Sequence, residues 1–248
     1  MKEFLYSRNA VYESLRARRR NIFHIQIAEG AQVKGRITDI LLLADQQKVR
    51  VERVPKTRLD KIHPDHQGVV AEVSSYSYAD LVDILDQARA QNEPPLILIL
   101  DSLQDPQNLG SLLRTAEATG VHGVVIPLAH TAEVTPAVVN ASSGACEYLR
   151  ITRSNLALAI DILKTENVWI VGLDQNGERI GERTQRHLQG ALGLVVGSEG
   201  EGIRQLVRSK CDVLLGLPMR GQVGSLNAAA AGSVALYLAY FARKGDSP

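Results

Sequence analysis

The spacing of apolar and polar residues along the chain changes near residue 74 and separates two regions. In the first region, apolar positions at helical spacing alternate with short runs rich in β-branched residues. The predicted helices cover residues 10–18 and 36–45, and the predicted strands cover residues 22–28, 49–54 and 68–73. We therefore predict a small α/β domain over residues 1–73.

A linker and one helix are predicted to follow over residues 74–94. The segment opens with a Ser- and Tyr-rich stretch, and its apolar positions then recur on one helical face. That face consists of Leu81, Ile84, Leu85 and Ala88, and two consecutive prolines end the helix.

Strands and helices alternate in the remaining sequence, residues 95–248. The predicted strands cover residues 96–100, 124–127, 168–173, 193–197 and 213–217, and the predicted helices cover 111–119, 157–164, 203–209 and the segment from 225 onward. A turn is expected at Asn176 and Gly177. Such alternation is typical of an α/β fold whose parallel sheet is covered by helices on both faces.

The overall composition is that of a globular protein, with 45% hydrophobic and 22% charged residues. The longest apolar run, residues 228–242, is interrupted by Gly232 and Ser233 and is too short for a membrane span, so no membrane partner is expected. The charged amino terminus does not look like a secretory signal. Two distant cysteines fit a reducing cytoplasm and offer no metal site.

Positive charge is concentrated in the first quarter of the chain. Residues 1–61 contain 14 Lys and Arg against 7 Asp and Glu, whereas the rest of the chain contains 14 against 20. The candidate RNA-binding residues are Arg16, Arg18, Arg19 and Arg20, joined by Lys56, Arg58 and Lys61. Because the whole segment is skewed, we favour contact with nucleic acid over the alternative of a solvated helix end.

Three loops of the second region follow predicted strands and combine glycine with polar side chains. They are DPQNLGSLLRTA (105–116), VGSEGEGI (196–203) and LPMRGQVGSLN (217–227). In an open α/β sheet, ligands bind beyond the carboxyl ends of the strands, so the three loops are expected to meet there. Their candidate side chains are Asn108, Arg114, Ser198, Glu199, Ser225 and Asn227.

The glycine spacing differs from that of common nucleotide-binding and hydrolase motifs. Gly197, Gly200 and Gly202 follow the pattern G-x-x-G-x-G, whereas dinucleotide-binding folds use G-x-G-x-x-G. The nucleophile elbow G-x-S-x-G is also missing from this loop. A dehydrogenase and a serine hydrolase are therefore disfavoured, and a binding module that uses the loops as plain turns stays open.

In order and spacing, the three loops closely resemble the signature motifs of the SpoU (TrmH) RNA ribose 2'-O-methyltransferases of the SPOUT superfamily. The resemblance rests on DPQNLGSLLRTAEATGVHGVVIP, VVGSEGEGI and LPMRGQVGSLNAAAAG and covers about the last 150 residues. The front segment, with SRNAVYESL and HQGVVAEV, is similar to the small RNA-binding domain of family members that methylate a guanosine in 23S ribosomal RNA.

This resemblance implies a parallel-sheet domain with a deep trefoil knot, a homodimer, and S-adenosylmethionine as the methyl donor. By motif position, the donor pocket would be lined mostly by backbone groups of Gly197, Leu217, Met219, Ser225 and Leu226. Without the motif, Leu217 and Leu226 would be read equally well as core residues.

The side chains expected around the reacting 2'-hydroxyl are Arg114, Asn108, Glu199, Ser225 and Asn227. Transfer needs the oxygen in line with the sulfur–methyl bond and its proton removed, so positioning and general-base help should dominate. In this family the arginine has been proposed as the base. Because a guanidinium stays protonated, we expect Arg114 instead to grip the target phosphate and to stabilise the developing alkoxide. In family members this arginine usually comes from the partner subunit.

Each of these side chains also has a structural alternative. Asn108 could cap the helix near residue 111, and Ser225 could cap the last helix. Glu199 could bind amides of its own loop, and Arg114 could form a surface salt bridge.

The preferred substrate is a guanosine of 23S ribosomal RNA, read from the front domain. Transfer RNA and an adenosine of 23S ribosomal RNA, as in a resistance methylase, are enzyme alternatives. An RNA-binding protein that has kept the fold and lost transfer is the alternative outside enzymes.

Overall fold

The chain folds into two compact units that are not contiguous in sequence. The computed structural model describes residues 2–222 and 224–244, so residue 223 of the third predicted loop lies outside the described residues, as do the two chain ends. The first unit contains Met1–Ser77 and Glu133–Tyr148, and the second contains Tyr78–Ala132 and Leu149–Pro248. Residues 133–148, predicted as part of the second domain, thus cluster with the amino-terminal residues.

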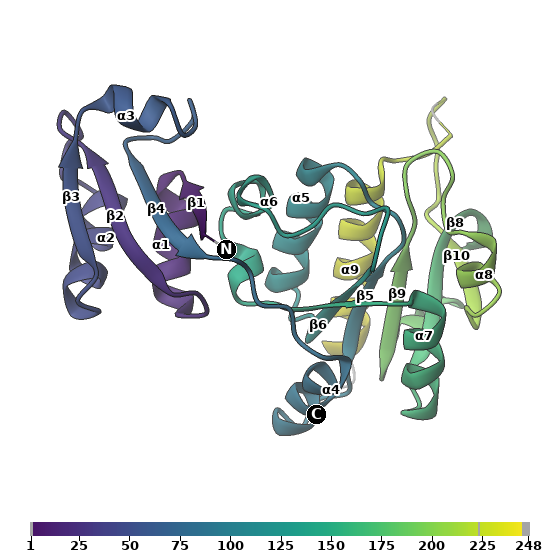
Figure 1. Cartoon of the computed structure of the whole chain (residues 1–248). Helices are drawn as coiled ribbons and strands as arrows, with labels where there is room; N and C mark the ends of the chain where they lie inside the picture. The colour runs from purple at the N-terminus through teal and green to yellow at the C-terminus, as the bar shows by residue number, and fades with distance from the viewer. Residues whose placement is uncertain (1, 223, 245–248) are drawn as a thin grey trace. The chain divides into compact units, whose positions relative to one another are not determined.

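The first unit is built on a four-stranded sheet with the strand order β1-β4-β2-β3. Its elements are β1 (Lys2–Tyr6), α1 (Arg8–Ala17), β2 (Ile22–Ala28), α2 (Arg36–Gln46), β3 (Arg50–Val54), α3 (Lys56–Asp60), β4 (Val69–Ser74), α6 (Pro136–Ala141) and the 3-10 helix η1 (Ala145–Glu147). Strands β2 and β3 are parallel, and β4 is antiparallel to β1 and β2. Helices α1 and α2 lie side by side (Figure 1) and bury Leu15, Ile37 and Ile40.

The apolar pattern located α1, α2, β2, β3 and β4 within a few residues but missed β1 and α3. Strand β1 has the sequence KEFLY, in which the two buried residues Leu5 and Tyr6 are adjacent. No alternation marks such a short strand, so the pattern could not separate it from a loop.

The second unit is an α/β layer structure with a six-stranded sheet in the order β10-β8-β9-β5-β6-β7. Its strands are β5 (Leu96–Leu100), β6 (Gly123–Pro127), β7 (Arg150–Ser154), β8 (Trp169–Arg179), β9 (Leu192–Val196) and β10 (Val213–Gly216), and every pair of neighbours is parallel. Its helices are α4 (Leu81–Ala90), α5 (Pro106–Ala118), α7 (Leu156–Thr165), α8 (Gln205–Arg208), α9 (Ala228–Lys244) and the 3-10 helix η2 (Gln185–Leu188). The predicted α/β class with a parallel sheet is confirmed.

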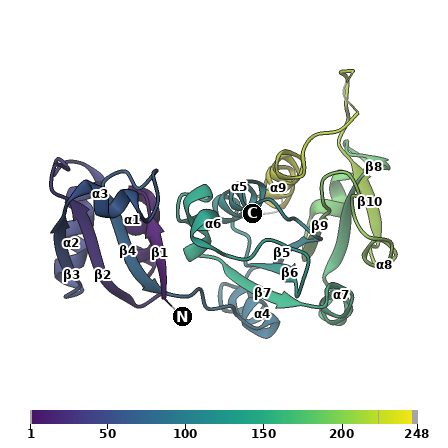
Figure 2. The same ribbon diagram turned by 45° about the horizontal axis from the view of Figure 1, so that its top comes forward.

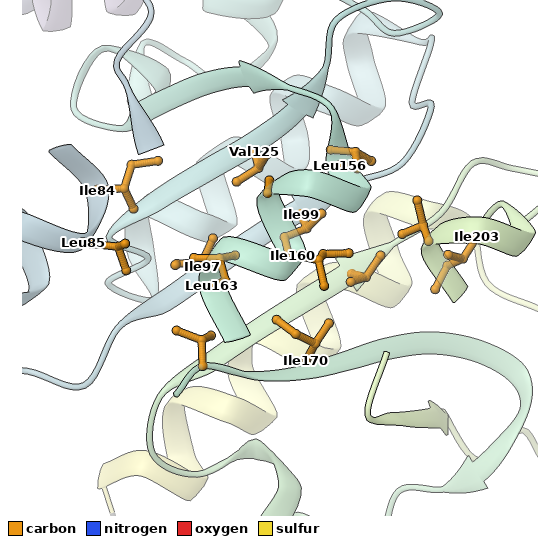
Figure 3. Close-up of a cluster of buried hydrophobic side chains, with 14 residues drawn as sticks. Ile84, Leu85, Ile97, Ile99, Val125, Leu156, Ile160, Leu163, Ile170 and Ile203 are labelled. Carbon is orange, nitrogen blue, oxygen red and sulfur yellow. The ribbon is translucent and has the colours of Figure 1, made fainter. Parts of the chain in front are cut away.

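Helices cover both faces of this sheet. Figure 2 shows α4 and α7 on one face and α5 and α9 on the other. On the first face, Ile84 of α4 and Ile160 of α7 pack with Ile97 and Ile99 of β5 in a fully buried cluster (Figure 3). Burial on both faces explains why β5 reads as the unbroken apolar run LILIL.

The chain reverses its direction across the sheet between β5 and β9. From β5 it adds β6 and β7 on one side, and it then adds β8, β9 and β10 on the other. Loops that leave two parallel strands at such a switch point diverge and open a crevice at the carboxyl edge. The first two predicted loops follow β5 and β9 and therefore flank this crevice.

Two boundaries differ from the sequence prediction for identifiable reasons. Helix α5 begins at Pro106, five residues early, because Asp105 caps it by accepting hydrogen bonds from the N–H groups of Gln107 and Asn108. Strand β8 continues through the predicted turn at residues 176–177 to Arg179.

Candidate functional site

A cavity of about 600 Å³ lies at the carboxyl ends of β8, β9 and β10. Its volume is within the range of small-molecule sites, about 300–1,000 Å³. The lining includes all five residues predicted to hold the methyl donor, which are Gly197, Leu217, Met219, Ser225 and Leu226. It also includes Glu199 and Asn227, so the second and third loops both line the cavity.

Gly197 allows the loop after β9 to fold back on itself. A Cβ at this position would lie 2.1 Å from the carbonyl carbon of Gly202 and 2.3 Å from its oxygen. The N–H of Ser198 donates to the carbonyl of Gly202, and the N–H of Gly202 donates back to the carbonyl of Ser198, both at 3.1 Å. The loop is therefore closed by its own backbone, and no side chain fits at its first residue.

The third loop leads directly into α9. Asn227 is the residue that caps this helix, because its side-chain oxygen accepts a hydrogen bond from the N–H of Ala230 at 2.7 Å. The alternative that gave this role to Ser225 is wrong. Leu226 is 42% exposed and lines the cavity, so the reading of Leu226 as a core residue is also wrong.

Asn108 and Glu199 are brought together from the first and second loops. The Nδ2 of Asn108 donates a hydrogen bond to Oε1 of Glu199 at 2.7 Å. Both residues line a second cavity of about 360 Å³ between the two loops. Asp105 supplies the cap of α5, so the side chain of Asn108 is directed to Glu199 instead of to its own helix.

Arg114 lies apart from these two residues. It is on the exposed side of α5, and it is not among the described residues that line either cavity. Within one chain, the predicted catalytic set therefore divides into a group at the cavities and an arginine elsewhere on the same helix as Asn108.

Sequence reasoning missed one wall of the larger cavity. Residues 173–176 of β8 line it, and Asp174 forms an ion pair with Arg208 of α8, which also lines it. The prediction ended β8 at residue 173, so these side chains were assigned to a turn. The sequence concealed the true length of β8, because the Asn-Gly pair at residues 176–177 has the composition of a tight turn.

The predicted arginine cluster of the first unit is only partly at the surface. Arg20 is buried, with 1% of its side chain exposed, and its Nε lies 2.9 Å from Oε1 of Glu147 while its Nη1 lies 2.7 Å from Oε2 of Glu3. Burial alone would lower the pKa of Arg20, but the two carboxylates more than offset this and raise it. The prediction that Arg20 contacts RNA is wrong.

Its three neighbours are solvent-accessible to different degrees. Arg16 is exposed beside Glu13 at 3.7 Å, and Arg18 is exposed at the end of α1 in the left-handed conformation. Arg19 is half-buried over the ring of Tyr76. These arginines precede β2, whereas Lys56, Arg58 and Lys61 follow β3, which is parallel to β2. The two basic groups therefore lie at opposite ends of the sheet and form separate surfaces.

In the described part of the chain, no group of three or more His, Cys, Asp or Glu side chains is arranged to hold a metal ion. Among the described helices, none has the length and apolarity needed to cross a membrane.

Comparisons with known proteins match both regions of the chain. Residues 95–237 match the model of the SpoU rRNA methylase family, and residues 4–79 match the model for RNA 2'-O ribose methyltransferase substrate binding. A Bacillus subtilis protein assigned to the TrmH tRNA/rRNA methyltransferase family is 41% identical over 240 residues, which cover 96% of this chain and 95% of that protein. A Staphylococcus aureus protein of the same description is 43% identical over 215 residues, 86% of each chain.

The fold is also similar to solved structures. The SpoU methyltransferase AviRb from Streptomyces viridochromogenes, solved with its cofactor S-adenosylmethionine, superposes with a TM-score of 0.79 at 23% identity. The match covers 98% of this chain and 91% of that one. At this identity the similarity concerns the arrangement of the backbone.

Proposed function

The chain belongs to the SpoU rRNA methylase family and is an S-adenosylmethionine-dependent RNA ribose 2'-O-methyltransferase; from this premise we propose that its substrate is a guanosine of 23S ribosomal RNA. The front segment supports a ribosomal substrate, because it resembles the domain that precedes the catalytic domain in guanosine-specific members. The name of the relatives covers transfer RNA as well, so a transfer RNA substrate is the first alternative to be tested. We expect the reaction in the cytoplasm, where both RNAs reside.

The larger cavity fits S-adenosylmethionine in size and in charge. Among the described residues that line it are the carboxylates of Asp174, Glu199 and Glu201 and the guanidinium of Arg208, so negative charge predominates and favours a sulfonium. Leu217 and its apolar neighbours in the third loop offer a surface for the adenine. When bound, the cofactor supplies an electrophilic methyl group, and the residues of the chain orient it toward the ribose.

Asn108 and Glu199 are the groups that we assign to the reacting hydroxyl. Their 2.7 Å hydrogen bond holds both side chains at the junction of the two cavities. Asn108 would orient the 2'-oxygen, and Glu199 would accept a hydrogen bond from the hydroxyl. Ser225 and Asn227 contribute from the opposite wall, where Asn227 also begins α9.

We infer a homodimer in which Arg114 serves the site of the partner subunit. This would explain why Arg114 lies outside the cavities of its own chain. Helix α9 carries a row of exposed apolar side chains, Val234, Tyr237 and Phe241, at the spacing of one helical face. A third, largely apolar cavity of about 450 Å³ adjoins this helix at Val234 and Leu238. A second copy that covers this face would place α5 of each chain near the cavities of its partner. We also propose that the second unit contains the trefoil knot of the family.

The observation that carries the site assignment is the convergence of the five predicted donor-binding residues on one cavity, and the front segment carries the choice of substrate. The test is transfer of labelled methyl from S-adenosylmethionine to purified 23S ribosomal RNA and to transfer RNA, followed by mapping of the alkali-resistant linkage. Labelling at a guanosine of 23S ribosomal RNA supports the proposal. Labelling of transfer RNA or of an adenosine supports one of the enzyme alternatives. Donor binding in calorimetry without transfer to any RNA would indicate a binding protein.

A further inference from the structure

A buried carboxylate ties together the two loops that carry Asn108 and Glu199. Asp101 is the first residue after β5, and it is fully buried. Its Oδ2 accepts a hydrogen bond from the backbone N–H of Arg204 at 2.9 Å, and its Oδ1 accepts one from Nε of Arg204 at 2.7 Å. The backbone N–H of Asp101 donates to the carbonyl of Val196 at 2.8 Å.

These bonds hold both ends of one loop. Val196 ends β9 and Arg204 precedes α8, so the segment 197–203 is attached to Asp101 where it starts and where it finishes. The same segment meets the loop after β5 a second time, through the bond between Asn108 and Glu199. The smaller cavity lies between these two links, with residues 102–105 on one side and Glu201 on the other.

We propose that Asp101 is a positioning residue for methyl transfer, which fixes Glu199 relative to Asn108 by holding the loop 197–203 at both ends. The proposal rests on the proposed function, because the rate of methyl transfer is its main measure. A displacement of about 1 Å at a reacting group can lower a rate about 100-fold, so a buried anchor of this loop should act on the chemical step. Asp101 itself touches neither cavity, so its effect is exerted through the loop.

Two variants and one control separate positioning from general stability. Asp101→Asn keeps the size of the side chain but presents an N–H group to one of the two N–H donors of Arg204. Arg204→Ala removes a guanidinium whose side chain is 46% exposed and keeps the backbone bond, so it should fold. Asp212→Asn is the control. Asp212 also accepts one hydrogen bond from a backbone N–H, that of Ile170 at 2.8 Å, and one from a cationic side chain, that of Lys164 at 2.7 Å, and it lies away from the cavities.

The experiment measures single-turnover methyl transfer at saturating RNA and donor, the affinity for RNA, the affinity for the donor by calorimetry, and thermal stability. We expect Asp101→Asn to lower the rate constant by about 10- to 100-fold and Arg204→Ala by about 3- to 10-fold, with RNA affinity changed less than about twofold. Asp212→Asn should lower thermal stability without changing the rate constant. An unchanged rate for Asp101→Asn, or an equal loss of rate in the Asp212 control, would overturn the proposal.

The failure of the proposed function gives a different result. If the wild-type chain methylates no RNA, the proposed function fails, and Asp101 is then judged by donor affinity alone. A donor affinity at least about fivefold weaker in Asp101→Asn than in Asp212→Asn supports the anchor, and equal affinities refute it.

Discussion

The backbone contact at Gly197 makes the larger cavity, which we propose as the donor site, sensitive to a single added methyl group. In Gly197→Ala the new Cβ would lie 2.1 Å from the carbonyl carbon of Gly202 and 2.4 Å from the nitrogen of Ile203. Ordinary contacts of a Cβ begin near 3.4 Å, so the returning strand of the loop must move by more than about 1 Å. Both contacts are with backbone atoms, which cannot rotate away as a side-chain end can.

The expected cost can be divided between donor binding and stability. Overpacking of this kind costs about 1–3 kcal/mol, and about 1.4 kcal/mol corresponds to a tenfold change in an equilibrium constant. Because the moved segment lines the cavity, we expect the dissociation constant of S-adenosylmethionine to rise by about 10- to 100-fold. Calorimetric titration of the purified variant measures this, and its thermal unfolding reports the remainder.

Gly221→Ala is the matched control in the third loop. A Cβ at Gly221 would meet no atom of the described residues within 4 Å, and Gly221 is not among the glycines with a positive φ. The variant should bind the donor with an affinity within about twofold of the wild type. Wild-type affinity in Gly197→Ala would refute the argument, because the loop would then tolerate a displacement that the cavity is supposed to register.

Three further predictions concern other parts of the molecule. Subunits carrying Arg114→Ala and subunits carrying Asn108→Ala should be inactive separately and regain part of the activity when mixed, as measured by labelled methyl transfer; no recovery would argue that each chain works alone. Arg20→Gln should lower the free energy of unfolding by about 3–5 kcal/mol, because it leaves a buried carboxylate unpaired, whereas Arg18→Gln should stay within about 0.5 kcal/mol in urea titrations. Burial lowers the pKa of His122, whose Nδ1 accepts the first N–H of β5. As the pH falls below the usual histidine value of 6.5, the unfolded chain binds a proton that the folded chain does not, so stability should fall by at most about 1.4 kcal/mol per pH unit, and His122→Gln should flatten this slope between pH 7.5 and 5.5.

The convergence of the loops on one edge could be predicted from local signals, whereas their assignment to the methyl donor came from the resemblance to the family. Each glycine-containing loop directly follows a strand, and parallel strands bring their carboxyl ends to one edge, so Gly197 and Leu217 could be placed together without coordinates. The wall formed by β8 was missed for the opposite reason. Asn176 and Gly177 have the composition of a tight turn, but Gly177 is needed where β8 passes β10, since its Cβ would lie 2.6 Å from the backbone of Leu214.

The position of Arg20 could not be obtained from a local pattern. Its partner Glu147 is 127 residues away in the sequence. A run of arginines has the same composition whether its members face solvent or a buried carboxylate, and only the tertiary structure separates the two. The same limit applies to the N-terminal cap of α5. Asn108 and Asp105 are both good capping residues, and the choice between them depends on the start of the helix at Pro106.

Residues 133–148 belong to the first unit although they lie within the sequence of the second, and this limits how the units could be exchanged between relatives. The polypeptide passes from one unit to the other three times, after residues 77, 132 and 148. A fragment that stops at residue 77 would keep the guanidinium of Arg20 but lose its partner Glu147. It would also expose the surface that residues 133–148 cover in the whole chain. A chimaera that exchanges the RNA-recognition module should therefore be spliced as two pieces of sequence that travel together.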